Sequence, residues 1–500
     1  MFYPAFTMKD ILKILFLCGI AIAIFYPLFY SEYAYTDEIV QLWYYKKGSD
    51  FQMFTPQGRY ITDKLFQWLF SSATTIKDIS SIRLFSLVGW LLSIPVWYYI
   101  IKRVVVKEKL PEILVFFSTL YIVCMPQFCI YVSWASCLEL FLANTTGLLS
   151  GYFLYVGLQY IAEKKSKFIL YVVLSVIAGL ISLFTYQNGF GCFLLPFLLH
   201  LISTGKISRQ LIIGVIGYLA MYGVYYLLFK YSLHANNIEA SNRTGISGDI
   251  AGKFRFLSKK ALPSSFHFTY IFNEQAKSGK IIYRVLLGVW VIANFIRQRE
   301  MPVFQRIVYP LIIFLFCAMI YLPSLLVKEN YASNRTLFAL NLAVFFLVMH
   351  TVIVFIKEGK GRIAFVSIIG GLFIVNAWYN FNKLFLSPIT HEYNVLNKYI
   401  RDNYTPVIQK VYFIRPAEDF FVSKYHITRS WDELGVPSSF FDWVPPFLVK
   451  QVVFEKTGDR LLADKIDVQH WLGKEEFDKS GIQPGDNTLV IDAETLLMSN

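Results

Sequence analysis

Two adjacent carboxylates, Asp37 and Glu38, follow the first long apolar segment, in the sequence Ser-Glu-Tyr-Ala-Tyr-Thr-Asp-Glu. A carboxylate near a hydroxyl group can remove its proton as the oxygen attacks an electrophilic carbon, and burial or a neighbouring charge raises the carboxylate pKa toward the working pH. The pair could also hold a divalent cation such as Mg²⁺ or Mn²⁺, although the spacing requires none. The alternative interpretation is that acidic residues at the start of a loop are only solvated.

A basic residue lies further along the same loop. Gly58-Arg59-Tyr60 precedes an amphipathic run at 61–70, which predicts a helix lying in the membrane interface. An arginine there could pair bidentately with a phosphate. The loop therefore combines a candidate base with a candidate anion-binding group, and this combination favours a functional interpretation over solvated acids.

Other polar groups sit at the ends of later apolar segments. Tyr186 and Gln187 end one segment, Glu139 lies near the start of another, and Arg335 opens a late one. Ionisable residues within membrane segments are costly and are candidates for function. The competing interpretations are an interfacial residue that samples water for Glu139, and snorkelling to the interface for Arg335.

These groups must be positioned by membrane helices. The chain has 500 residues, 56% hydrophobic and only 16% charged, against about 25% charge in average soluble domains. The net charge of +13 sits mostly in short loops, which is typical of a membrane orientation signal rather than nucleic-acid binding. Taking roughly 17–25 apolar residues per span, we predict about eleven spans, at 11–30, 82–101, 112–132, 136–161, 168–187, 189–203, 210–229, 281–297, 307–327, 336–356 and 363–386.

The loop charges predict the orientation. Basic residues gather before the first span and at every second connection, at 102–109, 164–167, 206–209, 297–306 and 357–362, as cytoplasmic loops do. The N-terminus is therefore expected inside, and an odd number of spans puts residues 387–500 outside. The first span could instead be a cleaved signal peptide, but Phe25, Tyr26 and Pro27 close it where small residues would be expected.

Residues 387–500 differ in composition from the rest, with mixed charge, Pro and Gly. We predict a small extracytoplasmic α/β domain there, with helices at 391–402, 444–456 and 468–478 and strands at 410–414 and 488–491. The six cysteines all lie within predicted spans and are expected to be reduced. No phosphate-loop, HExxH or CxxC motif is present. The expected fold is thus an all-α polytopic membrane domain at 1–386 followed by this α/β domain.

The order and sidedness of the motifs resemble a known family. An outer acidic pair after the first span (Asp37, Glu38), Gly58-Arg59 before an amphipathic helix, Tyr186-Gln187 at the end of a middle span and Arg335 at a late span start look like the type II glucosyltransferase family, which are membrane enzymes of the C-type glycosyltransferase fold. The acidic pair here is Asp-Glu where that family has Asp-Asp, and residues 387–500 have no counterpart that we can align.

The resemblance implies transfer of a sugar, such as glucose, from a polyprenyl-phosphate donor to a cell-surface glycan or lipid-linked acceptor. It implies an inverting reaction on the outer face of a bacterial inner membrane, in cell-envelope chemistry such as O-antigen or lipopolysaccharide modification. Asp37 would be the base, with Glu38 beside it. Arg59 and Arg335, with Tyr186, Gln187 and Glu139, would bind substrate.

Two alternative functions remain open. A flippase or other transporter of lipid-linked oligosaccharides would place ionisable groups at mid-membrane and show internal repeats, whereas no repeat is evident here. An O-antigen polymerase would share the lipid-linked substrates but would use basic motifs in two large outer loops. Membrane lipids are expected partners in every case, and nucleic acid in none.

Overall fold

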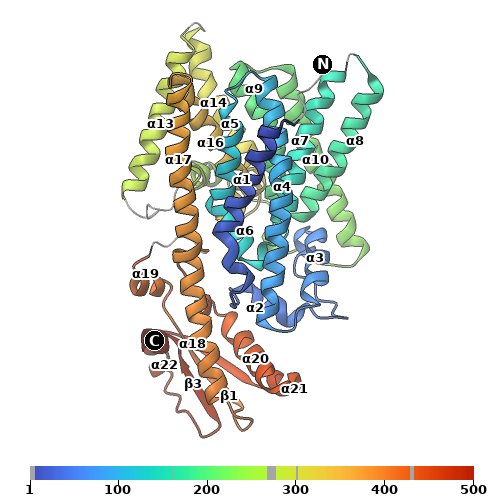
Figure 1. Cartoon of the computed structure of the whole chain (residues 1–500). Coiled ribbons are helices and arrows are strands. Elements are labelled where there is room, and N and C mark those ends of the chain that lie inside the picture. Colours follow the sequence, from blue (N-terminus) through green and yellow to red (C-terminus); the bar gives the residue numbers. More distant parts are fainter. Residues whose placement is uncertain (1–5, 162, 267–276, 300–301, 428–432, 500) are drawn as a thin grey trace.

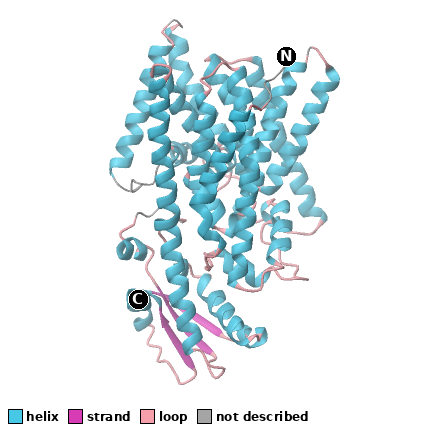
Figure 2. Cartoon of the chain, viewed as in Figure 1, coloured by secondary structure: helices cyan, strands magenta, loops and turns pink. Residues whose placement is uncertain are grey.

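The structure is a computed structural model that describes residues 6–161, 163–266, 277–299, 302–427 and 433–499. It consists of a long bundle of helices with a smaller domain at one end (Figure 1). Strands occur only in the smaller domain, as Figure 2 shows in magenta. The helix α1 (Met8–Phe25) begins at the far end of the bundle and runs toward that domain.

The bundle is built from helices that are apolar over most of their length. Seven helices of the described residues are long and apolar enough to cross a membrane, and a bent pair would make eight. The protein is therefore a multi-pass membrane protein by length and composition, while the count of eleven spans stays a prediction. The bundle helices after α1 are α2 (Asp37–Tyr44), α3 (Tyr60–Phe70), α4 (Ile79–Lys107), α5 (Ile113–Cys124), α6 (Pro126–Ser133), α7 (Leu140–Gly157), α8 (Lys165–Thr185), α9 (Leu195–Thr204), α10 (Arg209–Ala235), α11 (Ile250–Phe256), α12 (Leu262–Ser265), α13 (Lys277–Arg297), α14 (Val303–Ile320), α15 (Leu322–Leu326), α16 (Asn334–Phe355) and α17 (Lys360–Tyr379).

The helices are interrupted at two places between α5 and α7. Between α5 and α6 the axis bends by 46°, because Pro126 forces Met125 out of the helical region, to ψ 150. Between α6 and α7 the chain forms a short 3-10 turn, η4 (Ala135–Cys137). The second break matches the interruption predicted at 133–135, and it brings a loop to the end of the bundle near the smaller domain.

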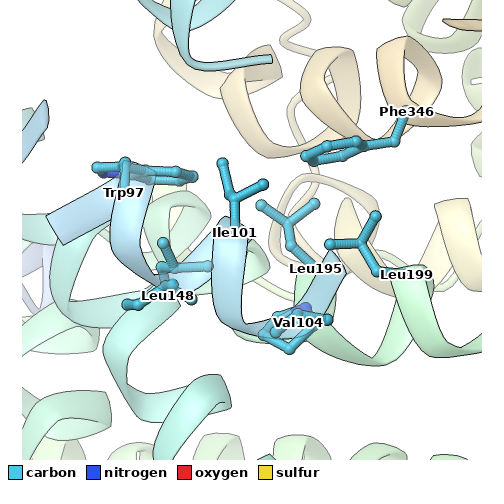
Figure 3. Close-up of a pocket in the computed structure, with 9 residues that line it drawn as sticks. Trp97, Ile101, Val104, Leu148, Leu195, Leu199 and Phe346 are labelled. Atoms are coloured by element: carbon cyan, nitrogen blue, oxygen red, sulfur yellow. The ribbon is translucent and has the colours of Figure 1, made fainter. Parts of the chain in front are cut away.

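The core of the bundle lies around α16. Of the apolar window of that helix 89% is buried, against 28–56% for the other unbent candidate spans. Close packing continues between α4, α7, α9 and α16, where a cavity of only about 10 Å³ remains, lined by Trp97, Leu148, Leu195 and Phe346 among other apolar side chains (Figure 3). A cavity this small and apolar holds no polar ligand, so it is a packing void.

A continuous helix joins the bundle to the smaller domain. Residues Lys360–Asn403 form one helical segment of 44 residues, made of α17, a π-helical stretch at Asn380–Leu386 and α18 (Ser387–Asn403). The predicted domain boundary at 386/387 thus falls inside a helix. The predicted helix at 391–402 is confirmed as part of α18.

The smaller domain is a three-stranded parallel sheet covered by helices. Its strands β1 (Lys410–Arg415), β2 (Asp467–Leu472) and β3 (Thr488–Asp492) lie in the order β2-β1-β3. The register pairs Val411 with Val468 and with Leu489. The other elements of the domain are α19 (Phe420–Tyr425), α20 (Val444–Thr457), α21 (Arg460–Asp464), α22 (Gly473–Lys479) and α23 (Ala493–Ser499).

The strand predictions at 410–414 and 488–491 and the helix at 444–456 are confirmed. The helix predicted at 468–478 is wrong in its first half, because residues 467–472 form β2 and only 473–479 are helical. Backbone pairing of this segment with β1 outweighs its local helical pattern. Tertiary pairing commonly overrides such weak local preferences.

Candidate functional site

The candidate site lies at the end of the bundle that carries the smaller domain. Four segments meet there, as their side-chain contacts show: the loop after α1, the turn η4, the end of α8 and the start of α16. The thiol of Cys137 in η4 lies within electrostatic range of Arg335, Glu139, Glu433 and Asp37. Residues that are hundreds of positions apart in the sequence are thus brought around one point.

Asp37 is the first residue of α2 and is half-buried. The residue before it, Thr36, has φ 44 and ψ −111, a conformation that is costly for a β-branched side chain. Its backbone N–H donates to the Ser438 hydroxyl at 2.8 Å, which helps to hold the strained turn. Such backbone strain clusters at functional sites, and here it sets the direction in which Asp37 enters the helix.

Glu38 occupies a different environment from its neighbour. It is fully buried and forms an ion pair with Arg83, which is also buried. Its Oε1 accepts from Arg83 Nε at 3.1 Å and from the Ala135 N–H. Its Oε2 accepts from Arg83 Nη2 and from the Tyr35 N–H at 2.7 Å. These four bonds use the acceptor capacity of the carboxylate.

Burial raises the pKa of Glu38, and the ion pair with Arg83 together with the two backbone N–H groups opposes that rise. Because both oxygens are engaged, Asp37 and Glu38 do not offer a shared pair of free carboxylates to a divalent cation. The described residues also contain no cluster of three or more His, Cys, Asp or Glu that could hold a metal. The arrangement therefore does not fit a metal at the acidic pair, and Glu38 is placed to support the loop.

Arg59 is held against an aromatic face. Its guanidinium carbon lies 4.4 Å from the centre of the Tyr186 ring and 5.8 Å from that of Phe54. Within the described residues the Arg59 side chain forms no hydrogen bond, and its Nε is buried without a partner. A half-buried guanidinium with its donors unused is a group prepared for an anionic ligand.

The loop that carries Arg59 is anchored by a buried acid. The Asp63 carboxylate accepts from the N–H groups of Met53 at 3.1 Å and Phe54 at 2.9 Å, and from Thr55. It also accepts from the Tyr45 hydroxyl, whose pKa is raised by burial and by the Asp63 charge, so that the hydroxyl stays protonated. These bonds fix the turn that presents Arg59.

Gln187 secures the other side of the loop. Its Nε2 donates to the Gln57 carbonyl at 2.8 Å and to the Tyr225 hydroxyl at 2.6 Å. Gly58 has φ +79, and a Cβ there would lie 2.1 Å from the Tyr225 oxygen. Gly58 is therefore required both by its backbone conformation and by the close approach of α10.

Glu139 is a further buried acid of the site. It caps the start of α7, is 2% exposed, and its Oε2 is buried without a hydrogen-bond partner among the described residues. It interacts electrostatically with both Arg59 and Arg335, and Tyr186 interacts with the same two arginines. The Glu139 carboxylate is therefore the acid that both arginines share.

Arg335 lies at the start of α16 and contacts the smaller domain. Its guanidinium carbon is 4.5 Å from the centre of the Trp134 ring, and its side chain also contacts the Tyr331 hydroxyl. The buried Glu433 carboxylate lies 3.5 Å from Arg335 Nε and accepts from the Asn334 N–H at 3.1 Å. The side chain of Arg335 retains 24% exposure, so the arginine is accessible from one side.

The structure thus brings Asp37, Arg59, Glu139, Tyr186 and Arg335 together, with Gln187 as a support and Glu38 in a separate ion pair. Sequence reasoning missed Arg83 and Glu433. A signal existed for Arg83, since a charge inside a predicted apolar span requires a partner. No comparable signal existed for Glu433, which lies in a loop of mixed composition. A comparison of the chain with protein-family models and with curated proteins found no match.

Proposed function

We propose that this protein is an integral membrane glycosyltransferase that moves a sugar from a polyprenyl-phosphate donor to a cell-surface glycan or lipid-linked acceptor. The observation that carries the proposal is Arg59, whose guanidinium stacks on Tyr186 without any hydrogen bond among the described residues. The buried Glu139 carboxylate lies within electrostatic range of both Arg59 and a second arginine, Arg335. A donor with a lipid tail and a phosphate head needs cationic donors at the edge of a membrane bundle.

The chemistry assigns one role to each group. The acceptor hydroxyl oxygen forms a bond to the anomeric carbon, the bond from that carbon to the phosphate oxygen breaks, and the electron pair leaves with polyprenyl phosphate. Asp37, the half-buried acid, takes the hydroxyl proton as general base. Arg59 and Arg335 stabilise the negative charge on the departing phosphate. Attack from the face opposite the phosphate inverts the configuration of the sugar.

The remaining groups hold this arrangement in place. Glu139 lies within electrostatic range of both arginines and helps to orient them. Tyr186 provides the surface on which Arg59 lies, and Gln187 fixes the adjoining loop. Glu38 acts as a positioning residue through Arg83, because its oxygens are engaged by that side chain and by two backbone N–H groups.

The finer features of the proposal rest on the loop charges and the family resemblance. They are eleven spans, a C-type glycosyltransferase fold, a cytoplasmic N-terminus, and a site on the outer face of a bacterial inner membrane. The helical continuity from α17 into α18 supports a C-terminal domain that covers the site end of the bundle. The envelope glycan that accepts the sugar would be O-antigen or a related polymer.

The proposal is tested with the purified full-length protein and polyprenyl-phosphate glucose, by measuring release of polyprenyl phosphate. Asp37→Asn should lower turnover by about 10²-fold or more, the usual scale of general-base catalysis, with folding unchanged. Asp50→Asn is the control, because Asp50 is an exposed acid of the same loop. Arg59→Ala should lower the turnover of the polyprenyl-phosphate donor. Arg59→Lys should retain only part of the wild-type turnover, since lysine lacks the planar guanidinium that can donate two parallel hydrogen bonds to a phosphate.

Two results would contradict the proposal. Full turnover in both Asp37→Asn and Arg59→Ala would remove the loop after α1 from the reaction. Movement of the intact lipid-linked sugar across vesicles that hold the protein, with no release of polyprenyl phosphate, would identify a transporter in its place.

A further inference from the structure

A polar cavity lies at the opposite end of the bundle from the candidate site. Its volume is about 440 Å³, within the range of ligand pockets. It is formed where α5 begins, where α9, α13 and α16 end, and where α17 begins, at the end of the molecule away from the smaller domain (Figure 1). None of these residues belongs to the candidate site described above.

One histidine and two arginines contribute hydrogen-bond donors to the wall of this cavity. His350 of α16 is 3% exposed and lines the cavity. Arg297, the last residue of α13, has its Nη1 3.2 Å from His350 Nδ1. Because a guanidinium can only donate, Nδ1 accepts this bond and the ring proton lies on Nε2. Among the described residues Nε2 has no hydrogen-bond partner, so this N–H donor remains unused.

Arg297 is held in place by a second bond, from Nη2 to the Ile202 carbonyl at 3.1 Å. Arg362 of α17 lines the same cavity and is 15% exposed in its side chain. It donates through Nε to the Ile356 carbonyl at 2.9 Å and through Nη1 to Glu358 at 2.6 Å, which leaves Nη2 without a bond among the described residues. Two arginines and a histidine N–H thus converge on one space.

Cationic residues outnumber acids around this cavity. The cavity is lined by three cationic residues, Lys109, Arg297 and Arg362, and by two acids, Glu112 and Glu358. Both acids are exposed, and Glu358 is already paired with Arg362. Arg297 and Lys109 are exposed like the two acids, whereas His350 is buried and the Arg362 side chain is 15% exposed, so hydrogen-bond donors lie both at the mouth and in the wall of the cavity. Such a wall favours an anion with several acceptor oxygens, for which arginine is the preferred partner.

We propose that this cavity binds a phosphate-bearing group, in a site separate from the candidate transfer site. The shared chemistry is a phosphate whose oxygens accept from Arg297, Arg362 and His350 Nε2. That phosphate belongs either to an anionic phospholipid headgroup or to a soluble phosphorylated molecule. The cavity lies at one end of the bundle, where a lipid headgroup could reach it.

The test uses the delipidated full-length protein in detergent with two probes. One is inorganic pyrophosphate, and the other is phosphatidylglycerol added in mixed micelles. Bound probe is counted by native mass spectrometry, and the thermal stability of the protein is followed as a function of probe concentration. Stabilisation that saturates with either probe supports the site, and the probe that acts identifies the source of the phosphate.

Variants locate the binding. Arg297→Gln and, independently, Arg362→Gln should each weaken the apparent affinity about tenfold or more, the scale of one charge-assisted hydrogen bond. Lys360→Gln is the matched control, since Lys360 is an exposed cation next to the same loop that does not line the cavity. Binding of neither probe, or equal weakening in Lys360→Gln, would overturn the proposal.

Discussion

The buried ion pair between Glu38 and Arg83 allows the sharpest test of a structural assignment. The two side chains are 0% and 1% exposed. Removing one partner of such a pair leaves a buried charge without compensation, which typically costs about 3–5 kcal/mol. Glu38→Gln and Arg83→Met should each lower the free energy of unfolding by an amount of about that size. The double variant should lose less than the sum of the single losses, because its second change removes the uncompensated charge.

The assay is unfolding by SDS in mixed micelles, followed through the fluorescence of the ten tryptophans of the chain. The exposed pair Lys479–Glu475, with side chains 73% and 83% exposed, provides the control. Glu475→Gln should change the unfolding curve little, because exposed ion pairs contribute little. The reasoning is refuted if Glu38→Gln unfolds like the wild type. Loss of sugar transfer in that stable variant would make Glu38, rather than Asp37, the base.

Three further outcomes are expected. Gly58→Ala should destabilise the protein by more than about 1 kcal/mol in the same titration, since its φ is +79 and a tyrosine hydroxyl lies 2.1 Å from the added Cβ, whereas Gly223→Ala, with nothing within 4 Å, should be tolerated. Glu433→Gln should speed proteolysis of the C-terminal domain, because the carboxylate joins that domain to the start of α16; an unchanged rate would contradict this role. A reporter fused after Asn500 should be active outside the cell and one fused near Lys360 inside, and the reverse pattern would invert the orientation.

Much of the membrane architecture could be predicted because apolar run length is set by the bilayer. Seven of the helices in the described residues are long and apolar enough to span, or eight with the bent pair. The predicted span at 189–203 is instead a 3-10 stretch followed by the ten-residue helix α9. The break predicted at 133–135 lies beside the turn η4. The continuous helix from α17 to α18 could not be anticipated, since the change in composition at Ser387 suggests a boundary while the backbone simply continues. The strand β2 was missed because its pairing with β1 depends on residues more than fifty positions away.

The candidate site was predictable in its members but not in its details. Asp37, Arg59, Glu139 and Arg335 are charged groups near span ends, and that is a signal visible in the sequence. Asp37 and Glu38 have different environments because adjacent residues of a helix point in different directions. The Glu38 side chain faces Arg83, whereas Asp37 is half-buried. The contact of Glu433 with the start of α16 depends on the packing of the C-terminal domain against the bundle. No local sequence pattern indicates this contact.

The central claim, sugar transfer from a polyprenyl-phosphate donor to a surface glycan, is tested most directly by mass spectrometry of envelope glycans. Cells lacking the gene are compared with the same cells expressing the wild-type protein or Asp37→Asn at equal abundance. The account predicts a hexose-sized increase in glycan mass with the wild type and none with Asp37→Asn. Identical glycan profiles in all three strains would contradict it.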